Sequence, residues 1–354
     1  MKEMLVPDPW QGPADQVMWP CMTWVQKLPN TYCALWQKWP GANGVELPPG
    51  YKVYMVSFHL EAVDLDWVQQ QSKNLQAPVI VLTDGSSYGS DIDFYPFYYW
   101  HYQLDLMKHW WQRPVPKQIT HKFSAICNRV TQSKLLVITQ LLETAGSMEC
   151  LISLGDWMEE KDIHYREKTG SPLLDHITEI FFSRYAGRKI SLDGFDNSLN
   201  YQRYTSDPWQ SVYQSAALHF TNESFHYSHM QSAHGSYTHP GPFLTEKTFK
   251  CLLGSTGFVP VGQFDTYGTL ERLGFQFDYG FDTSWDRDSG NLSRLTSIMH
   301  LIEDLSKYSV GTLYEMTHKS SEHNRQWITS GGFFDACEKI NQATQTEILA
   351  RFDH

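Results

Sequence analysis

The stretch that decides the fold of this chain reads Leu218-His-Phe-Thr-Asn-Glu-Ser224, then a histidine-rich segment, then Phe243-Leu-Thr-Glu-Lys-Thr-Phe-Lys-Cys-Leu-Leu-Gly254 and Gly257-Phe-Val-Pro-Val-Gly262. Its pattern predicts a strand over 216–221, a helix over 245–253 that ends at a glycine, and a second apolar strand over 258–261. A strand, a helix and a strand in succession indicate an α/β fold with a parallel sheet.

Two charged residues, Glu246 and Lys247, stand at the predicted start of this helix. A helix N-terminus offers unpaired backbone N–H groups and a partial positive charge, and it is a natural seat for a phosphate. A lysine there adds a full charge, and a glutamate is suited to hold ribose hydroxyls. The simpler interpretation is an exposed helix start, where a first-turn glutamate is favoured in any protein.

The same stretch resembles the nucleotide-sugar-binding motif of the fucosyltransferase-like glycosyltransferases, in which a strand and a Glu-Asn-Ser turn precede a Thr-Glu-Lys helix and a Val-Pro-Val strand. It also resembles a group of phage and bacterial proteins with a TEKTFK…G…L..LGF signature. Here that signature is Thr245 to Lys250, Gly262, Leu270 and Leu273 to Phe275. The strong part of the resemblance covers residues 216–300, and a weaker part extends back to about residue 122.

The resemblance implies that Glu246 binds the ribose hydroxyls of a nucleotide and that Lys247 binds its diphosphate, with Thr245 beside them. The family usually has Glu-Asn-Ser after the strand, whereas this chain has Asn222-Glu223-Ser. The order differs, so both Asn222 and Glu223 are candidates to face the ligand.

Two basic residues follow the predicted strand over 123–128: Arg129 in the turn and Lys134 in the first turn of the next helix. A cation near a helix N-terminus is mildly unfavourable for the fold, and an anion bound there would explain it. In similar enzymes a basic residue in this region neutralises the leaving diphosphate, which is the main electrostatic task of glycosyl transfer. Both residues join the predicted donor site, and an ordinary surface role is the alternative.

A second β-α-β pattern lies nearer the N-terminus, with apolar strands over 51–58 and 78–83. Residues 1–50, rich in Pro, Trp and Gly, are expected to form an irregular but ordered wrap, and Pro114 and Pro116 predict a linker because proline stops a helix. We expect two Rossmann-like β/α domains facing across a cleft, the GT-B arrangement. Their bounds are 1–115 on the acceptor side, 120–330 for the nucleotide sugar, and 331–354 for a C-terminal helix that crosses back onto the first domain.

In open α/β sheets, ligands bind at the carboxyl ends of the strands. Three carboxylates near such ends in the first domain are candidates for the general base of an inverting transfer. They are Glu61 after the first strand, and Asp84 and Asp91 after the second. Each is also an ordinary turn residue by type.

The sequence predicts no metal centre and no tightly bound cofactor, with the nucleotide sugar acting as co-substrate. Five histidines lie between residues 219 and 239, but no carboxylate or cysteine stands at ligand spacing. We expect a flexible loop there that caps the nucleotide, and a zinc hydrolase built on His226 and His229 is the weakest alternative. Asp91-Ile-Asp93 is the kind of pair that holds Mn²⁺ or Mg²⁺ on a diphosphate, so a divalent metal is compatible with the site but not required.

The chain is unusually aromatic, with 13 Trp, 19 Tyr and 19 Phe. Many of these rings lie between residues 94 and 111, where a packed core and a stacking platform for the acceptor are both open interpretations. No apolar run reaches the ~18 residues of a membrane span. The N-terminus does not resemble a signal peptide, so the expected compartment is the cytoplasm, that of the host if the chain is phage-encoded.

The net charge of −11 makes a nucleic-acid partner less expected, whereas a local basic run from Arg113 to Lys134 favours one. The expected function is transfer of a sugar from a nucleotide-diphosphate donor to an acceptor hydroxyl. The acceptor is a glycan, a small molecule, or a modified base such as hydroxymethylcytosine in phage DNA. The alternative is a non-catalytic nucleotide- or nucleic-acid-binding protein with a transferase-like fold.

Overall fold

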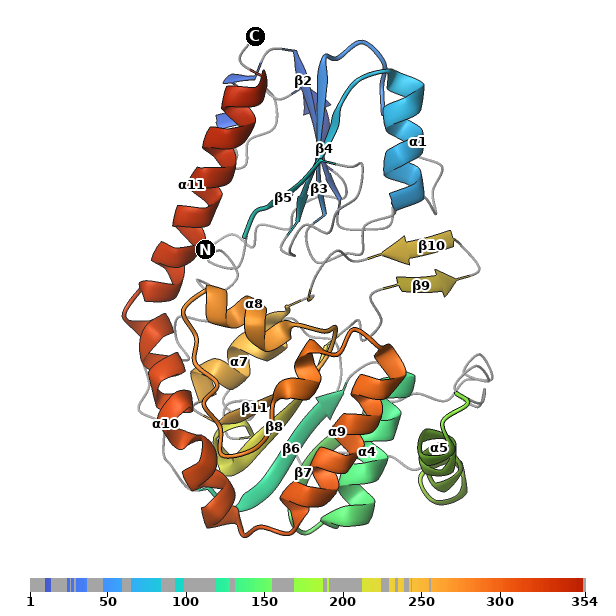
Figure 1. The fold of residues 1–354 in the computed structure, drawn as a ribbon, viewed down its shortest axis with the longest axis vertical. Coiled ribbons are helices and arrows are strands. Elements are labelled where there is room, and N and C mark those ends of the chain that lie inside the picture. Colours follow the sequence, from blue (N-terminus) through green and yellow to red (C-terminus); the bar gives the residue numbers. More distant parts are fainter. Residues whose placement is uncertain are drawn as a thin grey trace. The chain divides into compact units, whose positions relative to one another are not determined.

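The fold is mixed α/β and divides into two compact units, each built on a largely parallel sheet (Figure 1). Unit 1 contains residues 1–101, 227–243 and 334–354, and unit 2 contains residues 102–226 and 244–333. The structure, a computed structural model, describes residues 10–13, 24–25, 27–28, 30–36, 47–58, 65–83, 93–98, 119–127, 131–154, 169–186, 190, 212–223, 229–232, 235–238, 242, 244–254 and 256–352.

Unit 1 holds a five-stranded sheet in the order β1-β2-β3-β4-β5. Strands β2 to β5 are parallel, and β1 pairs antiparallel with β2 at the edge. The predicted strands over 51–58 and 78–83 are β3 and β4, joined through α1 (Leu65–Leu75). The bounds of the strands are β1 Trp10–Pro13, β2 Thr31–Trp36, β3 Val53–Phe58, β4 Val79–Thr83 and β5 Asp93–Pro96.

The expectation that residues 1–50 form an irregular wrap is wrong for β2. This strand lies between β1 and β3 and contributes Tyr32 and Cys33 to the core. Its apolar residues stand in a segment dominated by Pro, Trp and Gly, whose composition hides a short strand. The backbone N–H and C=O groups of β2 pair with those of β3, and nothing in the local sequence predicts this pairing.

Alternation along β3 divides the core of unit 1 into two layers. Tyr54 and Val56 face α1, where Trp67 and Val68 pack. The opposite layer, which includes Trp24, Met55 and Phe97, receives Ile348 of the last helix, α11 (Gly332–Phe352).

Helix α11 is also fixed to the end of β5 by polar contacts. Asn341 accepts a hydrogen bond from the Tyr98 backbone N at 2.8 Å and donates one to the Tyr98 carbonyl at 3.0 Å. Thr344 donates to the Pro96 carbonyl at 2.8 Å. These contacts agree with the expectation that the last helix returns to the N-terminal domain. Tyr95, Phe97 and Tyr98 are buried, which favours core packing for this part of the aromatic run.

The histidine-rich segment, expected to be a flexible loop, contains an antiparallel hairpin of β9 (His229–Ser232) and β10 (Gly235–Thr238). It is grouped with unit 1, and β10 contacts α1. The expectation was wrong because both strands are polar and give no period-2 apolar signal. His226, His234 and His239 lie outside the described residues.

Unit 2 holds a four-stranded sheet, all parallel, in the order β11-β8-β6-β7. The sequence predicts β6, β8 and β11 to within about two residues. The bounds of the four strands are β6 His121–Cys127, β7 Cys150–Leu154, β8 Ala216–Asn222 and β11 Gly257–Val261.

The chain winds outward in two directions from the middle of this sheet. It runs from β6 through α4 (Gln132–Thr144) to β7 on one side, and from β8 through α7 (Glu246–Gly254) to β11 on the other. Because such crossovers are right-handed, α4 and α7 cover opposite faces of the sheet, as Figure 1 shows. The carboxyl ends of β6 and β8 therefore form a topological switch point, where open α/β sheets bind their ligands.

The remaining helices of unit 2 complete its two outer layers. Helix α4 packs against α5 and α9, and α10 packs against α7, β8 and β11. No helix in the described parts of the chain is long and apolar enough to cross a membrane. The bounds are α5 Pro172–Arg184, α8 Thr266–Arg272, η5 Ser284–Arg287, α9 Asn291–Ser306 and α10 Val310–Thr329.

Candidate functional site

Two lysines from different helices lie at the switch point of unit 2. Lys134 is in the first turn of α4, directly after β6, and only 4% of its surface is exposed. Lys247 is in the first turn of α7, after β8, with 26% of its side chain exposed. Burial raises the pKa of the Cys127 thiol at the end of β6 to about 12, while the charges of Lys134 and Lys247 act to lower that pKa.

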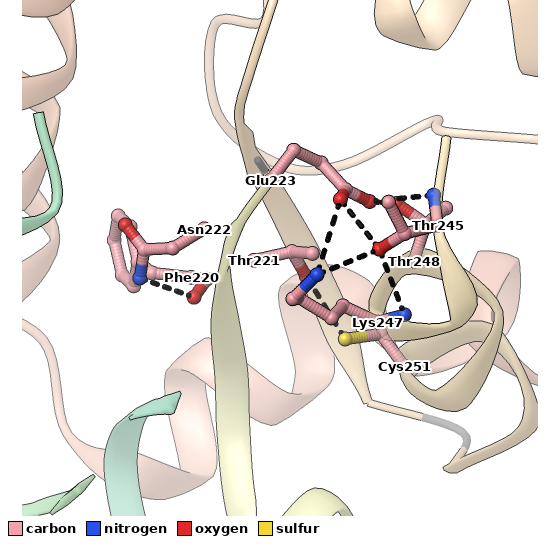
Figure 2. Close-up of polar contacts among 8 residues, drawn as sticks. All are labelled: Phe220, Thr221, Asn222, Glu223, Thr245, Lys247, Thr248 and Cys251. Carbon is pink, nitrogen blue, oxygen red and sulfur yellow. Dashed lines mark hydrogen bonds and ion pairs between the residues drawn. The ribbon is translucent and has the colours of Figure 1, made fainter. Parts of the chain in front are cut away.

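The N-terminus of α7 is occupied by a carboxylate of the chain itself (Figure 2). Glu223, 2% exposed, accepts hydrogen bonds from the Thr245 backbone N at 3.1 Å and the Thr245 hydroxyl at 2.6 Å. The Thr248 hydroxyl donates a third bond at 2.6 Å. Thr245 in turn accepts a bond from the Lys247 backbone N at 3.2 Å, which is the hydrogen bond of a helix N-cap.

These contacts change the interpretation of Glu223 and Thr245. Both were predicted to bind the donor, but in the structure they bind each other and are buried. Together they position Lys247, whose Nζ lies 3.1 Å from the Thr245 hydroxyl and 3.9 Å from Glu223 Oε2. A phosphate at the tip of α7 would meet the negative charge of Glu223, so α7 contributes Lys247 rather than an anion-binding N-terminus.

The N-terminus of α4 has the opposite character. Its N-cap, Thr131, has an extended backbone, and its side chain bonds Ser133 Oγ at 3.1 Å instead of capping the helix. The first turn contains no acidic residue, and it carries Lys134. The positive end of the helix dipole and a lysine therefore act together at the end of β6, where an anion is favoured.

Asn222, the last residue of β8, points away from this network. Figure 2 shows Asn222 and Phe220 on one side of the strand and the Glu223 network on the other, as strand alternation requires. Asn222 is 1% exposed, and its Nδ2 donates to the Phe220 carbonyl at 3.2 Å. Its Oδ1 is a buried acceptor without a hydrogen-bond partner.

The segment after β11 borders the switch point on the β8 side and is held by two residues that sequence reasoning missed. Arg294 of α9, fully buried, donates from Nε and Nη2 to the Gly262 carbonyl at 3.3 and 3.2 Å and from Nη1 to the Asp288 carbonyl at 2.7 Å. Asp286 accepts a bond from the Tyr267 backbone N at 2.7 Å. Burial raises the pKa of the Asp286 carboxyl to about 7.

A signal for Arg294 was present in the sequence. It stands in helical register with Ile298, Leu301 and Leu305, which line the buried face of α9. An arginine at a core position of an amphipathic helix indicates a buried polar network.

Several predicted site residues cannot be placed. Arg129, Glu61, Asp84 and Asp91 lie outside the described residues, and of Glu246 only the backbone, the first residue of α7, is described. Phe58 and Thr83 pair at the carboxyl ends of β3 and β4, and Glu61 and Asp84 follow these strands in the sequence.

The basic run does not form one surface in the part of the chain that is described. His121 and Lys122 lie at the amino end of β6, and Lys134 follows its carboxyl end. Lys122 is bound to Glu149 at 2.8 Å and to the Ser306 carbonyl at 2.8 Å. A seven-residue strand is roughly 20 Å long, and this length separates Lys122 from Lys134 along the sheet.

Comparisons of the chain with models of protein families, with curated proteins and with solved structures find no match. The family resemblance of the Thr245–Lys250 stretch therefore rests on its residues. Among the described side chains, no group of three or more His, Cys, Asp or Glu is arranged to hold a metal ion.

Proposed function

We propose that this protein transfers a sugar from a nucleotide-diphosphate donor to an acceptor hydroxyl and that unit 2 binds the donor. The observation that carries the proposal is the position of Lys134 and Lys247. They stand in the first turns of the helices that follow two adjacent parallel strands, at the switch point of a doubly wound sheet. Mononucleotide phosphates bind at such places in open α/β folds.

The positive charge of two lysines matches the charge of a diphosphate better than that of a single phosphate. A nucleoside diphosphate leaves with a charge that grows in the transition state, and fixed positive charges stabilise it most in a site shielded from water. Lys134, almost fully buried, and Lys247, partly exposed, supply a charge from each face of the sheet. The N-terminus of α4 adds a partial positive charge, and because the helix is fixed, no dipole has to reorient during the reaction.

In this proposal the chain has the GT-B arrangement, and unit 1 binds the acceptor. Glu61 and Asp84 follow the carboxyl ends of β3 and β4 and are the candidates for the general base. The acceptor in this proposal is a hydroxyl group of a glycan, of a small molecule or of a modified base in DNA.

A non-catalytic nucleotide-binding protein is the second candidate. The same two lysines would bind a nucleotide without any chemistry. The general-base candidates distinguish the two functions: they matter for turnover and not for nucleotide binding.

The test has two steps. A thermal-shift screen with UDP, GDP, ADP, CMP and dTDP selects the nucleotide, because ligand binding raises the melting temperature by mass action. Release of that nucleotide from its sugar conjugates is then measured with the wild type and with Asp84→Asn and Glu61→Gln. Turnover that falls at least tenfold in one variant with binding unchanged supports the transferase. Binding without turnover of any conjugate supports the binding protein, and no binding of any nucleotide contradicts both.

A further inference from the structure

The side chain of Asn222 contains a buried hydrogen-bond acceptor whose orientation is fixed. Nδ2 bonds the Phe220 carbonyl of its own strand. The flipped amide would place Oδ1 against that carbonyl, and two acceptors repel each other. Oδ1 is therefore the atom left without a partner. Buried polar atoms are paired in the great majority of cases, so an unpaired one at a strand end in a ligand-binding crevice points to a missing donor.

The register of the sheet places this acceptor on the face that α7 does not cover, which is the face of α4 and Lys134. Ser124 of β6 is level with His219 of β8, so three residues further along the strands Cys127 is level with Asn222. The rings of Phe123 and Phe220 are in contact, which shows that Cys127 and Asn222 lie on one face of the sheet by alternation. Helix α4, which carries Lys134 in its first turn, packs on this face, whereas Lys247 belongs to the Glu223 network on the other face.

We propose that Asn222 Oδ1 accepts a hydrogen bond from a hydroxyl group of the bound nucleotide sugar, next to its diphosphate. This inference rests on the proposed function. The deprotonated phosphate oxygens carry no donor, so the partner of Oδ1 belongs to a neighbouring part of the ligand. The ribose and the transferred sugar are both attached to the diphosphate, and both carry hydroxyl groups. Asn222 then makes the site prefer a nucleotide or nucleotide sugar over inorganic diphosphate.

The experiment measures affinities of the wild type and of Asn222→Leu by titration calorimetry. Leucine has the branched shape of asparagine, with methyl groups in place of the amide oxygen and nitrogen, and no polar atom. The probes are inorganic diphosphate, the nucleoside diphosphate chosen by the screen, and its sugar conjugate. We expect inorganic diphosphate to bind both proteins within twofold and the hydroxyl-bearing ligands to bind the variant at least tenfold more weakly. Loss with the nucleoside diphosphate assigns the ribose, and loss with the conjugate alone assigns the transferred sugar.

Thr256→Val is the matched control. Thr256 Oγ1 is also buried without a partner, but it precedes the amino end of β11 and thus lies at the opposite edge of the sheet. This variant is expected to bind all three probes as the wild type does. If Asn222→Leu does not fold, Asn222→Ala gives the same comparison.

Two results would overturn the inference while leaving the proposed function intact. One is equal binding of the nucleotide ligands by wild type and variant. The other is an equal loss for all three probes, inorganic diphosphate included, which indicates a structural role for Asn222. If the wild type binds none of the probes, the proposed function fails, and this inference fails with it.

Discussion

Replacing Glu223 with glutamine tests whether this residue caps α7 or contacts the ligand. Oε1 accepts bonds from the Thr245 backbone N and the Thr248 hydroxyl, and Oε2 accepts one from the Thr245 hydroxyl. The Thr245 oxygen already accepts from the backbone N and the Nζ of Lys247, so its own proton must point to Oε2. A glutamine NH₂ at either position therefore meets a donor, and at least one bond is lost.

The size of the effect follows from this count. Hydrogen bonds to a charged group contribute about 1.5–3 kcal/mol and neutral ones about 0.5–1.5 kcal/mol. At the middle of these ranges, one lost bond and two weakened bonds sum to about 5 kcal/mol, and the easier burial of an amide offsets part of it. We expect Glu223→Gln to lower the free energy of unfolding of unit 2 by about 1–3 kcal/mol, with Lys247 displaced and nucleotide affinity reduced only moderately.

Guanidinium denaturation measures the loss, and hydrogen exchange of the α7 amides assigns it to this unit. Glu271→Gln, at an exposed position of α8, is the control and is expected to leave both unchanged. Unchanged stability of Glu223→Gln combined with abolished nucleotide binding would refute the capping role, because it would mean that the carboxylate acts on the ligand.

Three further predictions concern the rest of the fold. The pKa of Asp286 in the folded protein, about 7, lies above its value in the unfolded chain. The stability of the wild type relative to Asp286→Asn should therefore fall as the pH rises from about 4 to 7 and then level off. Calorimetry across this pH range measures the difference in stability, and a difference that does not change with pH would contradict the raised pKa of the buried carboxyl. Gly274→Ala should cost about 3 kcal/mol, because φ is +94° and a Cβ would lie 2.6 Å from the Trp327 ring. Gly146→Ala, with φ +78° and open space around it, should cost only about 1 kcal/mol in the same denaturation assay. Equal costs for the two variants would disprove the contact between a Cβ at residue 274 and the Trp327 ring. Asn341→Leu should release the α11 amides to faster hydrogen exchange, since two bonds to the chain after β5 are lost, and unchanged protection would show that apolar packing alone holds the helix.

The core of unit 2 could be predicted from the sequence because its signals are local. Apolar residues are the majority in strands β6, β8 and β11, and most of each strand is buried, as expected for a parallel sheet covered on both faces. Helices α4 and α7 begin after them at the positions that periodicity indicates. Lys134 and Lys247 were assigned to one donor site from their positions at helix starts and from the resemblance, and both helices begin at the carboxyl end of the sheet.

The direction of side chains at the strand end could not be predicted in the same way. Asn222 and Glu223 are neighbours, and whether each faces α4 or α7 depends on which face each crossover helix covers. The resemblance groups them as one turn, whereas the fold gives them different environments. Glu223 became a cap because α7 lies on its side of the sheet.

Helix α10 was missed because its buried side is polar. Thr317, Ser320, Ser321 and Asn324 face the interior and bond mainly to backbone carbonyls, so the helix has no apolar stripe to detect. Thr317 and Ser321 bond carbonyls of α10 itself, whereas Ser320 and Asn324 bond the chain at Asp278 and Gln276, and these longer-range bonds are not local in the sequence.

Titration of the selected nucleoside diphosphate into the wild type, Lys134→Met and Lys247→Met tests the central claim most directly. Methionine keeps most of the length and apolar volume of lysine and removes its charge. The donor site at the switch point predicts at least a tenfold loss of affinity in each variant, with inorganic diphosphate losing as much as the nucleotide. Wild-type affinity in both variants would contradict the account, since the diphosphate would then bind elsewhere.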